Sequence, residues 1–441
     1  MTMHIHHLTG CAPAPLAHYL KALGILRLVA EQADPHARGW WQDEHFCLTT
    51  KLDYKELQRF FLEKYKPTPV FNPWGGRSGY YGGSPEATVR AALTVIEASP
   101  LDRLTMFRVA IALIRNAIEE IGGSKPDTDE SKLQLVRSIQ QHVRGSGSDW
   151  LGAVLADLGE SFQGPAIMGT GGNEGSGSYT AAYLAAVSEC IVNRHWDNSL
   201  ASTLFSKRTE AEAWDGSFAD SNGKKKTVNG PFRQFLPEGD ASPWDLILMF
   251  EGSLLFRSGL TRRSVSDRNR FMSSPFYFAA RGAGASSSAV SDEYVMNKGR
   301  QNLGRGEQWF PVWHQPASFT ELLSLISEGK CSIRGKHADR SVDAARAISQ
   351  LGVSRGINGF IRYGYLQRDN LATHFAVPLG RIEVRHRPHA RLIDDIAPWL
   401  DRLHRLARGK HAPACLIHAE RRLADALFGV LTHDETSERW Q

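Results

Sequence analysis

The segment between Pro15 and Pro35 limits the possible folds more than any other stretch of the chain. Its apolar residues recur at spacings of three and four: Leu16, Leu20, Leu23, Leu26 and Ala30. This spacing places them on one face of a helix, and proline is favoured at the start of a helix and rare within it. The sequence therefore predicts an amphipathic helix. Because the chain has 441 residues, we expect more than one core.

Helical and strand-like patterns alternate with glycine- and proline-rich breaks along the rest of the chain. Further helices are expected at about 53–65, 86–98, 101–121, 131–144, 149–160, 179–196, 243–258, 392–407 and 412–431. A strand is expected at 45–51, and 360–367 and 371–377 flank "RDN" as a hairpin. Residues 215–240 indicate an exposed loop. Residues 259–310 show little periodicity and are long for a structureless loop in a compact domain. We therefore expect this segment to be functional, partly disordered or ordered by a partner.

These patterns predict an α+β fold that is mostly helical and multi-domain, with short strands and a C-terminal helical region. We expect an N-terminal α+β domain at 1–165 and a segment with a glycine loop and helices at 166–258. A basic α+β and helical region would follow at 259–441.

Charge is unevenly distributed along the chain. Residues 256–441 hold 28 lysines and arginines against 18 acidic residues, whereas residues 1–255 hold 24 against 29. A net charge of +10 in one part of the chain suits a polyanionic partner, although an ordinary arginine-rich surface would have the same composition.

The compartment is expected to be cytoplasmic. The five cysteines are scattered and form no CxxC pair, the N-terminus "MTMHIHHLTG" has no signal-peptide pattern, and no run of about 18 apolar residues occurs. We therefore expect no membrane contact.

Enzyme motifs are mostly missing from the sequence. The stretch "MGTGGNEGSGSYT" lacks the lysine of a P-loop and is one residue too long for GxGxxG. His433-Asp434 resembles part of a metal phosphohydrolase site, but such a site needs further His and Asp residues. The stretch "MHIHH" (His4, His6 and His7) could bind a metal, and His4 and His6 would share one face of a strand, but no acidic partner lies nearby. We therefore predict no catalytic residues, no metal and no cofactor, while a nucleotide- or metal-dependent nucleic-acid-processing enzyme stays an alternative.

Basic residues in polar or Gly/Ser-rich surroundings are the candidates for phosphate contact. They are Lys224, Lys225, Lys226, Arg262, Arg263, Arg268, Arg270, Lys298, Arg300 and Arg305. Such residues follow a nucleic-acid backbone without a rigid surface. The alternative for each is a solvated loop.

The loop "NPWGGRSGYY" adds aromatic and polar candidates. Asn72, Arg77 and the aromatic side chains of Trp74 and Tyr80 could contact bases or wedge into a duplex step. Residues of this kind more often pin a loop to its own domain.

Several segments together resemble the large subunit of type I-G (formerly I-U) CRISPR interference complexes. They occur in the family's order along nearly the whole chain: "TGCAPAPLAHYLKALGILRLVAEQADPHARGWW", "NPWGGRSGYY", "GTGGNEG", "SSPFYF", "GRGEQWFPVW" and "FIRYGYLQRDN". The chain departs from the family at Glu174, where an aspartate is usual, and in the "GSGSYTAAYLAAV" that follows. Its last residues are "HDETSERWQ", in which Thr436 or Ser437 resembles the N-cap of a helix that only begins, so we expect that a C-terminal part is missing.

The resemblance implies a non-catalytic subunit of a crRNA-guided complex that reads a short protospacer-adjacent motif (PAM). Its implied partners are crRNA, double-stranded target DNA, the CRISPR backbone and crRNA-end-binding subunits, and a helicase-nuclease. Base pairing would read the target, while the protein reads the motif and the backbone. Thr170, Gly171, Gly172 and Asn173 would then form a tight loop close to nucleic acid, although a purely structural turn is equally compatible. A general nucleic-acid-binding protein is the remaining alternative.

Overall fold

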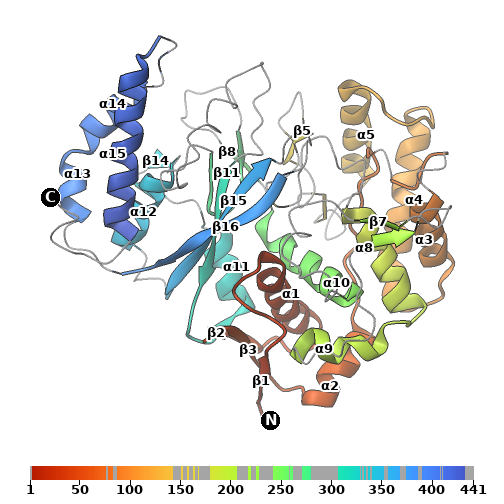
Figure 1. Ribbon diagram of the computed structural model, residues 1–441. Coiled ribbons are helices and arrows are strands. Elements are labelled where there is room, and N and C mark those ends of the chain that lie inside the picture. The colour runs from red at the N-terminus through yellow and green to blue at the C-terminus, as the bar shows by residue number, and fades with distance from the viewer. Residues whose placement is uncertain are drawn as a thin grey trace.

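The computed structural model shows a mostly helical α+β protein with two four-stranded antiparallel sheets (Figure 1). It describes residues 2–75, 78–82, 87–142, 150–151, 156–157, 162–163, 167, 179–205, 217–219, 225–227, 242–257, 259–261, 271–279, 306–327, 329, 332–333, 336–337, 340–351, 356–367, 374–385, 390–407, 409 and 411–432. Among these residues, no helix combines the length and apolar character needed to cross a membrane.

Two helices far apart in the sequence form the centre of the main core. They are α1 (Leu16–Gln32) and α10 (Pro243–Ser253), which lie side by side in Figure 1. A Cβ on Gly24 would lie 2.0 Å from the carbonyl oxygen of Leu248, so only glycine permits this approach. The structure confirms the predicted helix after Pro15, but α1 is buried on nearly all sides rather than on one face.

The first sheet packs beside this helix pair. Its order is β1-β3-β2-β12, and its strands are β1 (His4–Leu8), β2 (Arg38–Gln42), β3 (His45–Thr50) and β12 (Ala317–Ser318). Side chains alternate across the sheet, so Phe46 and Leu48 enter the core while His45 and Cys47 lie on the opposite face.

A group of helices covers the other side of α10 (Figure 1). Its members are α2 (Tyr54–Arg59), α3 (Ala87–Ala98), α4 (Thr105–Glu120), α5 (Asp129–His142), α8 (Tyr179–Val187) and α9 (Leu200–Phe205). The π-helical turns Phe60–Lys64 and Ser188–Val192 extend α2 and α8, and the 3-10 turns are Asp102–Leu104, Asp197–Ser199 and Leu254–Phe256.

The second sheet separates two hydrophobic cores. Its order is β10-β11-β15-β16, with β10 (Tyr277–Ala279), β11 (Gly306–Val312), β15 (Gly359–Gln367) and β16 (His374–Glu383). Phe310 and Ile361 point into the main core, whereas their neighbours Trp309 and Phe360 point into the second core. The period of two along a strand therefore places one sheet between two apolar layers.

Helices at the left of Figure 1 enclose the second core. They are α12 (Ser341–Leu351), α13 (Ala390–Asp395), α14 (Ala397–Ala407) and α15 (Ala414–Thr432). The remaining elements are α11 (Phe319–Ser327) and the short pairs β4 (Ala156–Asp157) with β5 (Phe162–Gln163), β6 (Ser217–Ala219) with β7 (Lys225–Thr227), β8 (Gly259–Thr261) with β9 (Phe271–Ser273), and β13 (Ser332–Ile333) with β14 (Lys336–His337).

Most predicted elements are present, and the differences have local causes. The hairpin around residues 368–370 and the two C-terminal helical segments occur as expected. Residues 156–157 lie in a strand instead of the helix predicted at 149–160. Strand β11 was not predicted, because both of its faces are buried and its sequence does not alternate between polar and apolar residues.

The predicted domain boundaries do not separate cores among the described residues. Strand β12 completes the N-terminal sheet by pairing with β2, and α10 packs on α1. Segments from 1–165, 166–258 and 259–441 therefore share the main core, and the second core consists of residues between Phe276 and Leu431.

Candidate functional site

The loop around Trp74 packs into the protein. Trp74 and Asn72 are buried, and Tyr80 is half-buried with its ring centroid 6.3 Å from that of Phe71. Burial raises the pKa of Tyr80 well above its ordinary value. These contacts suit the packing alternative for Trp74 and Tyr80, and their contact with nucleic acid stays a prediction. Arg77 lies outside the described residues.

Most other predicted contact residues also lie outside the described part of the chain. They are Thr170, Gly171, Gly172, Asn173, Lys224, Arg262, Arg263, Arg268, Arg270, Lys298, Arg300 and Arg305. The His433-Asp434 pair of the enzyme alternative also lies outside the described residues. The backbone of Lys225 and Lys226 belongs to β7, where these residues pair with Ala219 and Phe218. Their roles stay predictions.

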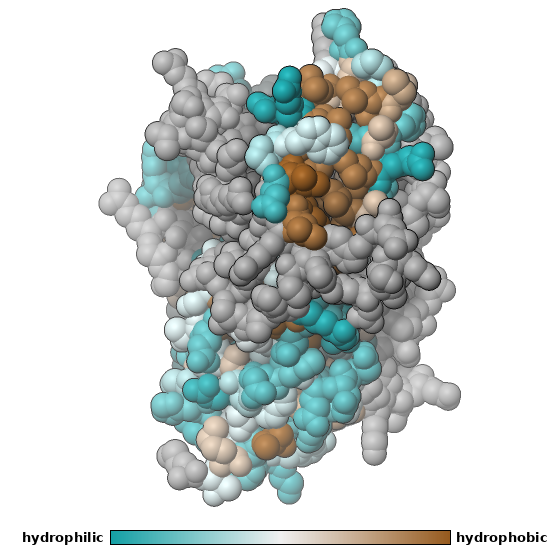
Figure 2. Space-filling view, turned by 90° about the vertical axis from the view of Figure 1, so that its left-hand side faces the viewer, coloured by the Kyte–Doolittle hydropathy of each residue, from teal (hydrophilic) through white to brown (hydrophobic). Residues whose placement is uncertain are grey.

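An apolar stripe is exposed on α13 and α14. Leu392, Ile396, Trp399 and Leu406 are exposed, with Trp399 55% accessible, and half-buried Leu403 lies between the last two. We call these five residues the α14 stripe. The adjacent face of the same helices is buried: Ile393 and Leu400 pack in the second core, and Ala397 and Ala407 are buried beside them. Figure 2 shows apolar surface gathered at this end of the molecule.

The arginines near the α14 stripe are of two kinds, exposed ones beside it and a buried one beneath it. Arg402 and Arg405 are exposed on α14. Arg340 is buried between α12, α14 and α15, where it meets Asp343 at 2.6 Å and Glu420 at 3.5 Å. Burial opposes the charge of Arg340, but these carboxylates outweigh it and raise its pKa. The buried network therefore holds three helices together, while the exposed arginines stay accessible.

Buried ion pairs also join the two central helices. Lys21 Nζ donates to Asp245 Oδ1 at 2.6 Å, and Arg27 Nη1 donates to Glu251 Oε2 at 2.8 Å. Glu251 also accepts from the hydroxyl groups of Tyr65 and Thr68 at 2.6 and 2.7 Å. Each carboxylate is thus compensated inside the core, and the set orients α1 against α10.

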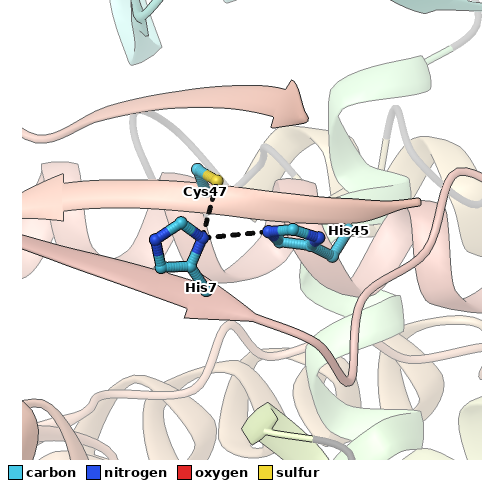
Figure 3. A group of neighbouring side chains, drawn as sticks. All are labelled: His7, His45 and Cys47. Atoms are coloured by element: carbon cyan, nitrogen blue, oxygen red, sulfur yellow. Dashed lines mark hydrogen bonds between the residues drawn. The ribbon is translucent and has the colours of Figure 1, made fainter. Parts of the chain in front are cut away.

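A cluster of three metal-ligating side chains lies on the outer face of the first sheet (Figure 3). His7 Nδ1 is 2.9 Å from His45 Nε2 and 3.5 Å from Cys47 Sγ. His7 is exposed, His45 is half-buried and Cys47 is buried. Burial raises the pKa of the Cys47 thiol to about 11, and Asp43 adds to the effect.

Sequence reasoning missed this cluster. It considered His4, His6 and His7 together but not His45 or Cys47. His6 is buried and its Nε2 lies 2.8 Å from the carbonyl oxygen of Leu52, so this ring has a packing role. Burial lowers the pKa of His6 and favours its neutral form. The His45-x-Cys47 spacing was the available signal, because residues two apart in a strand share a face.

No protein-family model matches the chain, and a search of curated proteins finds no match to it.

Proposed function

We propose that the chain is the large subunit of a crRNA-guided type I CRISPR surveillance complex, of the kind now called type I-G. One observation carries the proposal: the family-like segments between residues 9 and 370 occur in the family's order along the chain. An ordered series of this length is more specific than any one glycine loop.

Contacts between these segments support treating them as one inherited unit. Tyr19, in the first segment, donates from its hydroxyl group to the carbonyl oxygen of Pro311 at 2.8 Å. Trp313 donates from Nε1 to the carbonyl oxygen of Gly39 at 2.7 Å. The segments "GRGEQWFPVW" and "FIRYGYLQ" pair as β11 and β15. Residues that resemble the family therefore include those that build the centre of the fold.

In this role the protein would read the PAM and contact the DNA backbone, while the crRNA reads the target by base pairing. The net charge of +10 in residues 256–441 suits phosphate contact. Sequence readout needs side chains at base edges, and Asn173 and Arg77 are the residues that we assign to it.

The α14 stripe suits contact with a second protein subunit of the same complex. Its residues are spaced by four, three, four and three, which is the spacing of an apolar seam between two helices. Arg402 and Arg405 stand beside the seam, so we assign to it a helix of the partner subunit with an apolar stripe and acidic flanks.

The test is assembly of the complex from this chain, crRNA and the subunits encoded by the neighbouring genes. We expect the chain to co-purify with crRNA and to be needed for binding to a target duplex that carries the preferred motif. Complexes assembled without the chain should lose this motif dependence. A complex that selects the motif equally well without the chain would contradict the proposal, as would turnover of NTP or DNA by the isolated chain with Mg²⁺ or Mn²⁺.

Replacing Asn173 or Arg77 with Ala within this complex tests motif reading itself. We expect a loss of about 1–3 kcal/mol on the preferred motif and little loss on an unrelated duplex. Equal losses on both duplexes would instead assign these residues to backbone contact or to folding.

A further inference from the structure

The pairing of β1 with β3 brings His7, His45 and Cys47 together. His7 stands directly opposite Cys47 in the antiparallel register, and His45 precedes Cys47 by two residues on the same strand face. Both strands belong to the four-stranded sheet, whose other face packs on the main core through Phe46 and Leu48. The three side chains are therefore held by regular backbone rather than by a loop.

We propose that His7 Nδ1, His45 Nε2 and Cys47 Sγ bind one Zn²⁺ ion, with the fourth coordination position open to solvent. The inference is independent of the proposed role in a CRISPR complex, because it rests on these three residues alone. It also departs from the prediction that the chain has no metal site.

The distances already approach those of a zinc site. Zinc bonds of about 2.0–2.1 Å to nitrogen and about 2.3 Å to sulfur place tetrahedral ligands about 3.3 Å apart for two nitrogens and about 3.6 Å apart for nitrogen and sulfur. His7 Nδ1 and Cys47 Sγ are 3.5 Å apart, so this pair needs no movement. The two imidazole nitrogens at 2.9 Å need to separate by a few tenths of an ångström.

The third pair needs a larger but still local adjustment. All three ligand atoms lie within 4.8 Å of one another, so the gap from His45 Nε2 to Cys47 Sγ can close by rotation of the His45 ring. His45 is only half-buried and is the first residue of β3, directly after the turn from β2. Rotation of its ring therefore displaces no core residue.

The donor set selects the kind of ion. Two imidazoles and one thiolate suit zinc and other borderline or soft transition metals, whereas Mg²⁺ and Ca²⁺ require oxygen ligands. Binding converts the Cys47 thiol to a thiolate, and the proton passes to solvent buffer. The hydrogen bond between the two imidazoles is replaced by two bonds to the metal.

The orientation of the two rings favours a single geometry of the site. The weak hydrogen bond from the Cys47 thiol to Gln42 Oε1, at 3.6 Å, is lost with the thiol proton when the metal binds. The rings of His7 and His45 have centroids 5.2 Å apart and are tilted by 55° (Figure 3). This tilt lets both nitrogens point at one position instead of stacking face to face.

The test is a Zn²⁺ titration of chelator-treated full-length protein against a competing chromophoric chelator. We expect one Zn²⁺ per chain with a dissociation constant of about 1 µM or tighter. Co²⁺ in place of Zn²⁺ should give a thiolate-to-metal charge-transfer band in the near ultraviolet. The variants Cys47→Ser and His7→Ala should weaken Zn²⁺ binding by at least about 100-fold, and Cys47→Ser should abolish the band.

Matched controls separate the site from general thiol and imidazole binding. Cys415 and His418 are exposed on α15, so Cys415→Ser and His418→Ala should leave both the affinity and the band unchanged. His7 is exposed, so His7→Ala decides the question even where Cys47→Ser fails to fold. No stoichiometric binding by the wild-type chain, or binding that survives His7→Ala, would overturn the proposal.

Discussion

Lys21 Nζ lies 2.6 Å from Asp245 Oδ1 between two helices that are more than 200 residues apart in sequence, and both side chains are buried. Lys21 also donates to the carbonyl oxygen of Thr203 at 3.0 Å, and Asp245 Oδ2 accepts from the backbone nitrogen of Ser242 at the start of α10. One ion pair thus links the position of α1 to the N-terminal cap of α10.

Replacing Lys21 with Met should lower the free energy of unfolding by about 3–5 kcal/mol, because Asp245 would be left buried without its partner. Urea-induced unfolding followed by tryptophan fluorescence measures the change. Arg115→Ala is the control: it removes an exposed pair with Glu97 and should cost less than about 1 kcal/mol. Similar losses of unfolding free energy in the two variants would contradict a stabilising role for the buried pair of Lys21 and Asp245.

Replacing Gly24 with Ala should destabilise the protein by about 3 kcal/mol or more, because the new methyl group would meet the carbonyl oxygen of Leu248. Thermal unfolding and soluble yield report the effect. In contrast, a Cβ on Gly429 in α15 meets nothing within 4 Å, so Gly429→Ala should be neutral or stabilising by up to about 1 kcal/mol. A tolerated Gly24→Ala would show that α1 and α10 can separate at little cost.

Asp34 should make stability depend on pH in the acid range. Burial opposes ionisation, but hydrogen bonds from the backbone nitrogen of Lys51, from Thr50 Oγ1 and from the backbone nitrogen of His36 outweigh it and lower the pKa of Asp34 below its ordinary value. A pKa that is lower in the folded state stabilises the protein above the unfolded pKa, and this contribution disappears as pH falls through the folded pKa.

The variant Asp34→Asn should therefore be less stable than wild type by about 1–3 kcal/mol at pH 7. This difference should stay constant down to about pH 5 and narrow below about pH 4, since the carboxylate is protonated first in the unfolded chain and in the folded protein only at lower pH. Unfolding free energies measured at several pH values check the pattern. If the difference in unfolding free energy between the variant and wild type grew as the pH fell, a group other than Asp34 would control the acid dependence of stability.

Replacing Trp399 with Ser should leave the isolated chain within about 0.5 kcal/mol of wild type, because the ring is exposed. Co-purification with the other subunits of the proposed CRISPR complex should be abolished or strongly reduced. Leu323→Ser is the matched control, since Leu323 is an exposed apolar residue of α11 outside the α14 stripe. Unchanged assembly of the Trp399 variant would remove the stripe from the proposed subunit contact.

Replacing Arg262, Arg263, Arg268 and Arg270 with Ala should weaken nucleic-acid binding regardless of sequence. The dependence of the logarithm of affinity on the logarithm of salt concentration should become shallower by about one unit for each arginine that pairs with a phosphate. Titrations at several salt concentrations measure this slope, and Arg115→Ala in the acidic part of the chain is the control. An unchanged slope would identify the cluster as an ordinary solvated surface.

Elements whose causes are local could be predicted from the amino-acid sequence. Spacing of apolar residues and bounding prolines predicted α1, and turn residues between two apolar runs predicted β15 and β16. The α+β, mostly helical class followed from such patterns. Local signals suffice there because a helix face or a hairpin turn depends on residues close together in the chain.

Only the tertiary structure showed which distant segments contact each other. No sequence pattern placed Lys21 beside Asp245, and the apolar spacing predicted one buried face for a helix that is buried on nearly all sides. The same holds for His7, which reaches Cys47 through strand register across forty residues. Such contacts form only when whole helices and strands pack against each other. The spacing of residues within one segment does not specify which distant segment it will pack against.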